Sequence, residues 1–105
     1  MPVFIISVDL PNPTELAEEL GQRLLGKQVV KTGFPMTTFG TVAILEFPEV
    51  TNEELIAKVQ SEVESWISDK HRSLRLRKLT GKRQIQNLGM PTRAQEDLVC
   101  LEIRK

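Results

Sequence analysis

The sequence predicts an α+β domain of the ferredoxin-like plan, with a βαββαβ order, two helices on one face of a sheet, and an additional C-terminal strand. Two segments with helical periodicity alternate with segments that have the composition or periodicity of strands. The first and third predicted strands are apolar at both parities, as the two central strands of this plan should be. With 105 residues and no repeat or linker, residues 1–105 are predicted to form a single two-layer domain.

Composition and spacing indicate the first strand and the first helix. Residues 2–9, PVFIISVD, are rich in β-branched and aromatic side chains, which is typical of a strand buried on both faces. Asn12 is a favourable N-cap residue, and Pro13 fits the first helical position. Leucines at positions 16, 20 and 24 then form one apolar stripe, and Gly26 is placed to end the helix.

A hairpin is expected after the first helix. Residues 28–34 are predicted as a short strand, and residues 40–47, GTVAILEF, as a longer one. The segment FPMTTFG, residues 34–40, is the predicted connection between them, although it is more apolar than most hairpin loops. Pro48 marks the end of the second strand of this hairpin.

The second helix and two further strands complete the predicted order. Thr51 followed by Glu54 matches a capping box, and the apolar positions after it predict an amphipathic helix to about residue 68. Residues 73–79 alternate between leucine and basic side chains, which indicates a half-buried strand at an edge of the sheet. Residues 80–96 are predicted as a long connection, and residues 97–104, DLVCLEIR, as the last strand.

Composition argues against several classes of protein. Basic and acidic residues each number 14, so the formal net charge is zero, whereas proteins that bind DNA non-specifically are usually basic. The single Cys100 and the single His71 provide neither an internal disulfide nor the spacing of a metal site. We find no nucleophile–base set and no cofactor motif, and therefore expect a protein that is not an enzyme. Short apolar runs and an N-terminus unlike a signal peptide predict a cytoplasmic location.

The segment HRSLRLRKLTGKR, residues 71–83, is rich in basic residues and contains no acidic one. Charged side chains on an edge strand prevent pairing with other chains, and this protective role alone would explain a basic edge. Arginines spaced along a strand also suit phosphate groups, because each guanidinium offers a planar fork of donors. Six residues are therefore candidates for polyanion binding: Arg72, Arg75, Arg77, Lys78, Lys82 and Arg83.

RNA-recognition motifs share this order of elements and stack bases on the open face of their sheet. This chain is similar to them in element order and in the LEF ending of residues 45–47, and we do not assign it to that family. The positions that should carry stacking rings hold Val42 and Ile44. Base stacking of that kind is therefore not expected, and a prediction of RNA binding depends on the basic strand.

The predicted sheet face opposite the helices is unusually apolar, and such a face is rarely left in water. It is covered either by residues 80–96 folding back, by the same face of a second copy, or by another protein. The apolar hairpin tip is either part of the core or a loop that contacts a partner. The candidate interface residues are Val3, Ile5, Val42, Ile44, Phe34, Met36 and Phe39.

These features predict a small, non-catalytic binding or adaptor module. We expect it to act through protein–protein association, including a homodimer through the open sheet face. The alternative is a module that binds RNA or another polyanion through the basic fourth strand and the loop that follows it. No cofactor, metal or membrane partner is expected, and the identity of a protein partner stays open.

Overall fold

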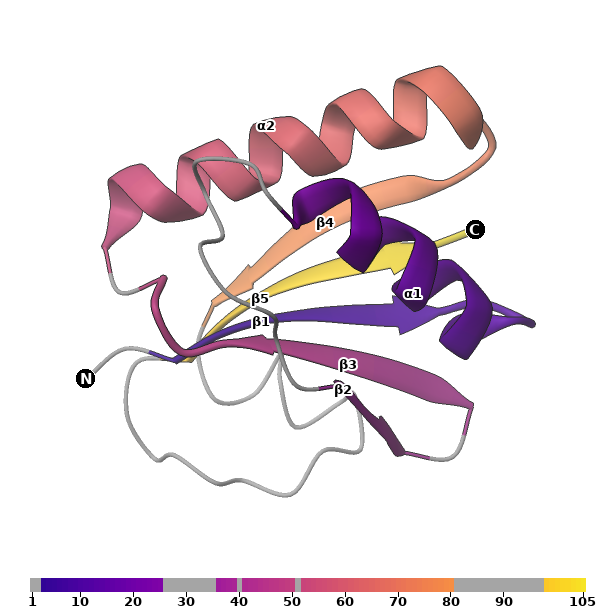
Figure 1. The fold of residues 1–105 in the computed structure, drawn as a ribbon, viewed down its shortest axis with the longest axis horizontal. Helices are drawn as coiled ribbons and strands as arrows, with labels where there is room; N and C mark the ends of the chain where they lie inside the picture. Colours follow the sequence, from indigo (N-terminus) through magenta and orange to yellow (C-terminus); the bar gives the residue numbers. More distant parts are fainter. Residues whose placement is uncertain (1–2, 26–35, 40, 51, 81–97) are drawn as a thin grey trace.

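The computed structural model describes residues 3–25, 36–39, 41–50, 52–80 and 98–105. Within these ranges the chain forms two helices and five strands (Figure 1). In chain order they are β1 (Val3–Asp9), α1 (Pro13–Leu24), β2 (Met36–Phe39), β3 (Val42–Phe47), α2 (Glu53–Lys70), β4 (Arg75–Thr80) and β5 (Leu98–Arg104). This order confirms the predicted α+β class and the predicted alternation of strands and helices.

The five strands form one mixed sheet in the order β2-β3-β1-β5-β4. Strand β5 pairs in parallel with β1 and antiparallel with β4, while the β1–β3 and β2–β3 pairs are antiparallel. In the ferredoxin-like plan the fourth strand pairs directly with the first, so the strand order differs from the predicted one. The C-terminal strand is an interior strand of the sheet, and among the described strands β2 and β4 lie at its edges.

The sequence of β5 explains its interior position. Leu101 and Ile103 are fully buried on the helix side of the sheet, and Cys100 and Glu102, at alternate positions, are buried on the other side. A strand that buries both faces belongs inside a sheet, where the backbone groups along both of its sides are also paired. An edge position would leave half of those backbone groups without a strand partner.

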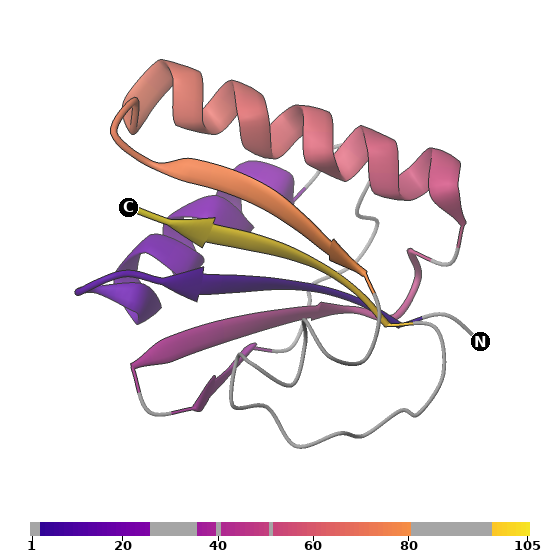
Figure 2. The same cartoon turned by 180° about the vertical axis from the view of Figure 1, so that it is seen from behind.

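Both helices lie on one side of the sheet, so the described part of the molecule has two layers (Figures 1 and 2). The main core lies between these layers and contains alternate residues of β1, namely Phe4, Ile6 and Val8. From the helices, Leu20 and Trp66 are buried against them. Burial of an apolar side chain of this size contributes roughly 1.5–3 kcal/mol, so the many buried side chains of this core strongly favour folding.

Strand β2 lies inside the segment that the sequence predicts as the hairpin connection. Its residues pair antiparallel with β3, and Met36 packs against the main core. Phe39 is opposite Val42, so only two residues separate the two strands. The connection of the hairpin is therefore shorter than predicted, because residues 36–39 of the apolar segment form a strand. The strand predicted at residues 28–34 lies outside the described residues.

The N-terminal ends of the two helices differ in how they are capped. Asn12 is the N-cap residue of α1, as predicted, although its side chain makes no capping hydrogen bond. The N-cap of α2 is Asn52, whose Oδ1 accepts a hydrogen bond from the Leu55 amide at 2.9 Å. The prediction of a capping box that begins at Thr51 is wrong by one residue, because an Asn side chain satisfies the free amide of the first turn equally well.

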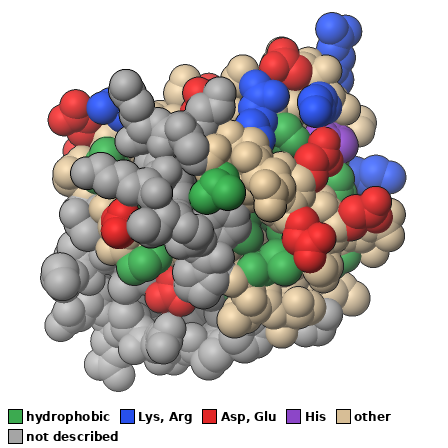
Figure 3. Space-filling model, in the orientation of Figure 1, with side chains coloured by type: hydrophobic (Ala, Val, Ile, Leu, Met, Phe, Trp, Pro, Cys, Tyr) green, Lys and Arg blue, Asp and Glu red, His purple; other side chains and the backbone are tan. Residues whose placement is uncertain are grey.

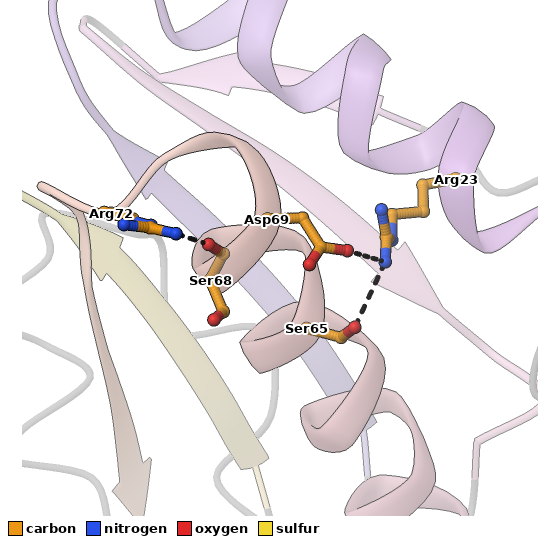
Figure 4. Close-up of polar contacts among 5 residues, drawn as sticks. All are labelled: Arg23, Ser65, Ser68, Asp69 and Arg72. Carbon is orange, nitrogen blue, oxygen red and sulfur yellow. Dashed lines mark hydrogen bonds and ion pairs between the residues drawn. The ribbon is translucent and has the colours of Figure 1, made fainter.

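Polar side chains connect α1 to the C-terminal end of α2. Arg23 Nη2 donates hydrogen bonds to Asp69 Oδ2 at 3.0 Å and to Ser65 Oγ at 3.2 Å (Figure 4). His71, the C-cap residue of α2, lies with its Nε2 3.0 Å from Glu19 Oε2. The contact with Glu19 links His71 at the end of α2 to α1. A positive charge at this helix end is also favoured by the helix dipole.

Candidate anion-binding site

The side chains of β4 alternate between the two faces of the sheet. Leu76 packs against the main core on the helix side. Arg75 and Arg77 therefore lie on the opposite face, which we call the open face. Leu79 lies on this face too, in a separate buried cluster. The predicted alternation of leucine and basic residues over 73–79 is therefore wrong at its end, because Leu76 and Leu79 are an odd number of positions apart and lie on opposite faces.

The register of β1, β5 and β4 places polar residues beside one another on the open face. Arg77 is opposite Glu102, and Arg75 is opposite Arg104. Opposite residues on neighbouring strands extend their side chains from the same face of the sheet. Three arginines from two strands thus gather around one carboxylate. We call this set of four residues the arginine cluster: Arg75, Arg77, Glu102 and Arg104.

Glu102 is the buried member of the arginine cluster, with only 4% of its side chain exposed. Its Oε1 lies 3.6 Å from Arg77 Nη2 and 3.7 Å from Arg104 Nη1. The same oxygen accepts no hydrogen bond from the described residues. Because an ionised carboxylate is costly to bury without an opposite charge nearby, the two guanidinium groups stabilise Glu102 in its place.

The arginine side chains, in contrast, extend into solvent. Arg77 is 61% exposed and Arg104 is 53% exposed, and Arg75 is also exposed. Among the described residues no carboxylate lies within ion-pair distance of Arg75, and its cross-strand neighbour Arg104 carries the same charge. Like charges directly opposite one another are destabilising. The cluster therefore has three positive charges and one negative charge, and an external anion would reduce the repulsion.

Asp9 of β1 is the next acidic residue on this face. It is opposite Arg104 in the register of the β1–β5 pair, and its side chain is exposed. Within the described part of the chain it makes no ion pair with that arginine. Asp9 therefore lowers the local positive charge without fixing the position of a guanidinium group.

Beside the arginine cluster the open face is apolar and buried. Ile5, Ile44, Leu79 and Cys100 form a second buried cluster, with Val42 packed against it. In the single chain Ile5 is 3% exposed and Ile44 is 4% exposed. Both are candidate interface residues from the sequence, and both are already removed from water. A second copy would therefore bury little additional surface on these two side chains.

Cys100 is a buried thiol in this second cluster. Its Sγ donates a hydrogen bond to Ser7 Oγ at 3.6 Å. Burial raises the pKa of the Cys100 thiol to about 11, an effect that the Ser7 hydrogen bonds oppose and the charge of Glu102 reinforces. A thiol that stays protonated at neutral pH is a poor nucleophile, so packing is sufficient to explain this residue.

The structure places two of the other candidate polyanion-binding residues, Arg72 and Lys78, away from the arginine cluster. Arg72 lies after α2, where its Nε donates to the Ser68 carbonyl oxygen at 3.3 Å and so satisfies part of the helix end (Figure 4). Lys78 is exposed, but strand alternation places it on the helix side of β4. Lys82 and Arg83 lie outside the described residues.

Where the structure describes them, the remaining candidate interface residues lie in different parts of the fold. Met36 is partly buried against the main core on the helix side. Val3 belongs to β1 and Phe39 to β2, at opposite ends of the described sheet register. Phe34 lies outside the described residues.

Sequence reasoning missed Glu102 and Arg104, which complete the arginine cluster. Their signal is the alternation in LVCLEIR, where positions 100, 102 and 104 share one face while Leu101 and Ile103 face the main core. A glutamate inside an otherwise apolar strand indicates a partner of opposite charge. The partner itself was not predictable, because it depends on the pairing of β5 with β4.

The helix side of the molecule has a different character. Figure 3 shows acidic side chains gathered over α1. A depression of about 530 Å³ beside this helix is lined by Glu15, Glu18, Glu19, Gly21, Gln22, Leu25 and Met36. Its acidic lining is unsuited to a polyanion. In the described ranges, no group of three or more His, Cys, Asp or Glu side chains is placed to hold a metal ion, and neither helix is long and apolar enough to cross a membrane.

Comparison with known proteins identifies no relative: no family model, curated protein or solved structure matches this chain. The function of the arginine cluster is therefore inferred from its geometry and charge.

Proposed function

We propose that this protein is a binding module that recognises a polyanion through the exposed arginines of the arginine cluster. The observation that carries this proposal is the charge balance of the cluster. Arg75, Arg77 and Arg104 lie on one face, where a single carboxylate among the described residues is in ion-pair contact, and all three arginines are exposed. Phosphate groups are suitable ligands, because a guanidinium group offers them two parallel N–H donors.

Protection of the sheet edge is the competing explanation for these arginines. It accounts for Arg75 and Arg77, because β4 is an edge strand and charged residues prevent it from pairing with other chains. It does not account for Arg104, because β5 already has a neighbour on each side. Arg104 is explained in part by its ion pair with Glu102, but its position directly opposite Arg75 increases repulsion within the chain, and an anionic ligand would reduce that repulsion.

The test is a titration of fluorescently labelled single-stranded RNA, followed by anisotropy, at about 50 mM and about 200 mM salt. Three phosphate contacts predict a slope of about −2 for the logarithm of affinity against the logarithm of salt concentration, or a roughly 20-fold loss over this range. An absence of binding at the lower salt concentration contradicts the proposal.

A matched pair of charge reversals locates the binding face. Arg75→Glu changes the open face of β4, and Lys78→Glu makes the same change on the helix side of the same strand. Because Arg75 has no carboxylate partner in the described part of the chain, its replacement should leave the fold intact. We expect Arg75→Glu to weaken RNA binding about tenfold and Lys78→Glu to change it much less. Equal losses would mean that no defined site exists.

Protein–protein association is the second candidate function, and the edge strand β2 favours it. In contrast to β4, β2 contains no charged residue, and its Thr37 and Thr38 are exposed. An uncharged edge strand is a template for pairing with another chain. If this edge mediates self-association, the mass measured by light scattering should rise with protein concentration, and Thr38→Lys should abolish the rise. A constant mass in the unmodified protein would exclude self-association.

A further inference from the structure

We infer that Glu102 is a positioning residue, which holds Arg77 and Arg104 in the orientation that binds a phosphate group. This inference rests on the proposed function and extends it to a residue that does not itself contact the ligand. Its basis is the contact of one carboxylate oxygen with guanidinium groups from two neighbouring strands, at 3.6 Å and 3.7 Å.

The position of Glu102 is itself well defined. It lies in an interior strand, between Leu101 and Ile103, which are completely buried. Its side chain is 4% exposed, so its rotamers are restricted by the surrounding atoms. The Glu102 carboxylate is thus a negative charge at a defined position, within ion-pair distance of the long side chains of Arg77 and Arg104.

The arginines benefit from such a fixed point. An arginine side chain has about 2 kcal/mol of rotamer entropy, part of which is lost when it binds a ligand. Contact with Glu102 restricts Arg77 and Arg104 before the ligand arrives, while their exposed N–H groups stay available. Preorganisation of this kind improves affinity by lowering the entropy lost on binding.

If Glu102 acted only through its negative charge, it would weaken the binding of an anionic ligand. A negative charge beside three arginines repels an anionic ligand, so its removal should strengthen binding. Positioning predicts that its removal should weaken binding. The two accounts therefore differ in the sign of the change caused by Glu102→Gln, which keeps the shape of the side chain and removes its charge.

Asp9 provides the matched control. It is exposed, lies on the open face opposite Arg104, and makes no ion pair with it in the described part of the chain. Asp9→Asn raises the net charge by the same amount as Glu102→Gln. We expect Asp9→Asn to strengthen the binding of labelled single-stranded RNA slightly, and Glu102→Gln to weaken it about tenfold with a smaller salt dependence. Stronger binding by both variants would overturn the inference.

Glu102→Asp gives an independent measurement. This variant keeps the charge and withdraws the carboxylate from both guanidinium groups by the length of one methylene. Positioning predicts weaker RNA binding, whereas electrostatics alone predicts no change. Circular dichroism and a thermal transition identify any variant that fails to fold, in which case the remaining substitution decides. Unchanged affinity in a folded Glu102→Asp variant would contradict the inference.

A spectroscopic measurement separates failure of this inference from failure of the proposed function. If the unmodified protein binds no RNA, the proposed function fails. Nitrogen-15 NMR of the arginine side chains then still tests the positioning role. Restricted guanidinium motion at Arg77 and Arg104 that is released in Glu102→Gln supports it, and equal motion in both proteins refutes it.

Discussion

At the scale of single residues, the open face changes from apolar to charged along three alternate positions of β5. Cys100 and Glu102 are buried, and Arg104 is exposed. The buried thiol and the exposed guanidinium are each stable where they lie, because one avoids water and the other remains hydrated. Glu102 lies at the boundary, where two arginines within ion-pair distance compensate its charge.

The Cys100 thiol should make the stability of the protein sensitive to alkaline pH. Its pKa is about 11 in the folded chain, compared with an ordinary value of 9.0. Because the folded chain holds this proton more tightly, the resulting stabilisation is complete below about pH 9 and is lost as the pH rises through about 11. We expect the free energy of unfolding in urea to fall over this range by roughly 2 kcal/mol more in the unmodified protein than in Cys100→Ala.

Thiol labelling provides a second measurement of the same property. In the folded protein at pH 8, Cys100 should react with a thiol reagent far more slowly than in urea, because it is buried and protonated. Rapid labelling of the folded protein, or an identical pH dependence of stability in Cys100→Ala, would contradict this account of the thiol.

At the scale of secondary-structure elements, the two helices contrast in their first turns. Both begin after an asparagine, but only Asn52 accepts a hydrogen bond from the backbone. We therefore expect Asn52→Ala to lower the free energy of unfolding by about 1 kcal/mol, a typical value for the loss of an N-cap. Asn12→Ala is the matched control and should cost much less. Equal losses, measured by chemical unfolding, would show that the side-chain hydrogen bond is not the source of the stabilisation.

The elements themselves were largely predictable from sequence. Apolar spacing located α1 and α2, and composition located β1 and β3, because these properties depend on neighbours along the chain. Strand β2 was misplaced, since the apolar segment around Met36–Phe39 has the composition of either a core strand or a hairpin tip. Only its pairing with β3 distinguishes these two arrangements.

Two of the four residues of the arginine cluster, Arg75 and Arg77, were predicted from the sequence, because strand alternation depends on neighbours along the chain. Alternation along β4 was enough to place Arg75 and Arg77 on one face. Arg104 joins them because β5 lies beside β4, and this neighbour is set by packing across the whole sheet. The sequence also suggested that Lys78 belongs with the arginines, but strand alternation directs it to the other face.

At the scale of the whole molecule, the sheet joins the two ends of the described chain. Val3 is opposite Leu98 and Asp9 is opposite Arg104, so the first strand pairs in parallel with the last. Contacts between residues so distant in sequence form slowly, because the intervening chain loses much entropy when they close. The β1–β5 pair at the centre of the sheet should therefore be among the slower contacts to form.

Removal of residues 98–105 should prevent folding altogether. The deletion takes Leu101 and Ile103 from the main core and leaves β1 and β4 without their shared neighbour. Loss of one large buried aliphatic side chain alone costs about 2–5 kcal/mol, so the sum approaches or exceeds the 5–15 kcal/mol that usually stabilises a domain. Deletion of Lys105 alone, which is exposed and follows β5, is the control and should leave the thermal transition unchanged. The fluorescence of Trp66 and near-ultraviolet circular dichroism report on the folded core. A cooperative transition in the chain of residues 1–97 would mean that the sheet closes without β5, and that the strand on which the arginine cluster depends is not required for the fold.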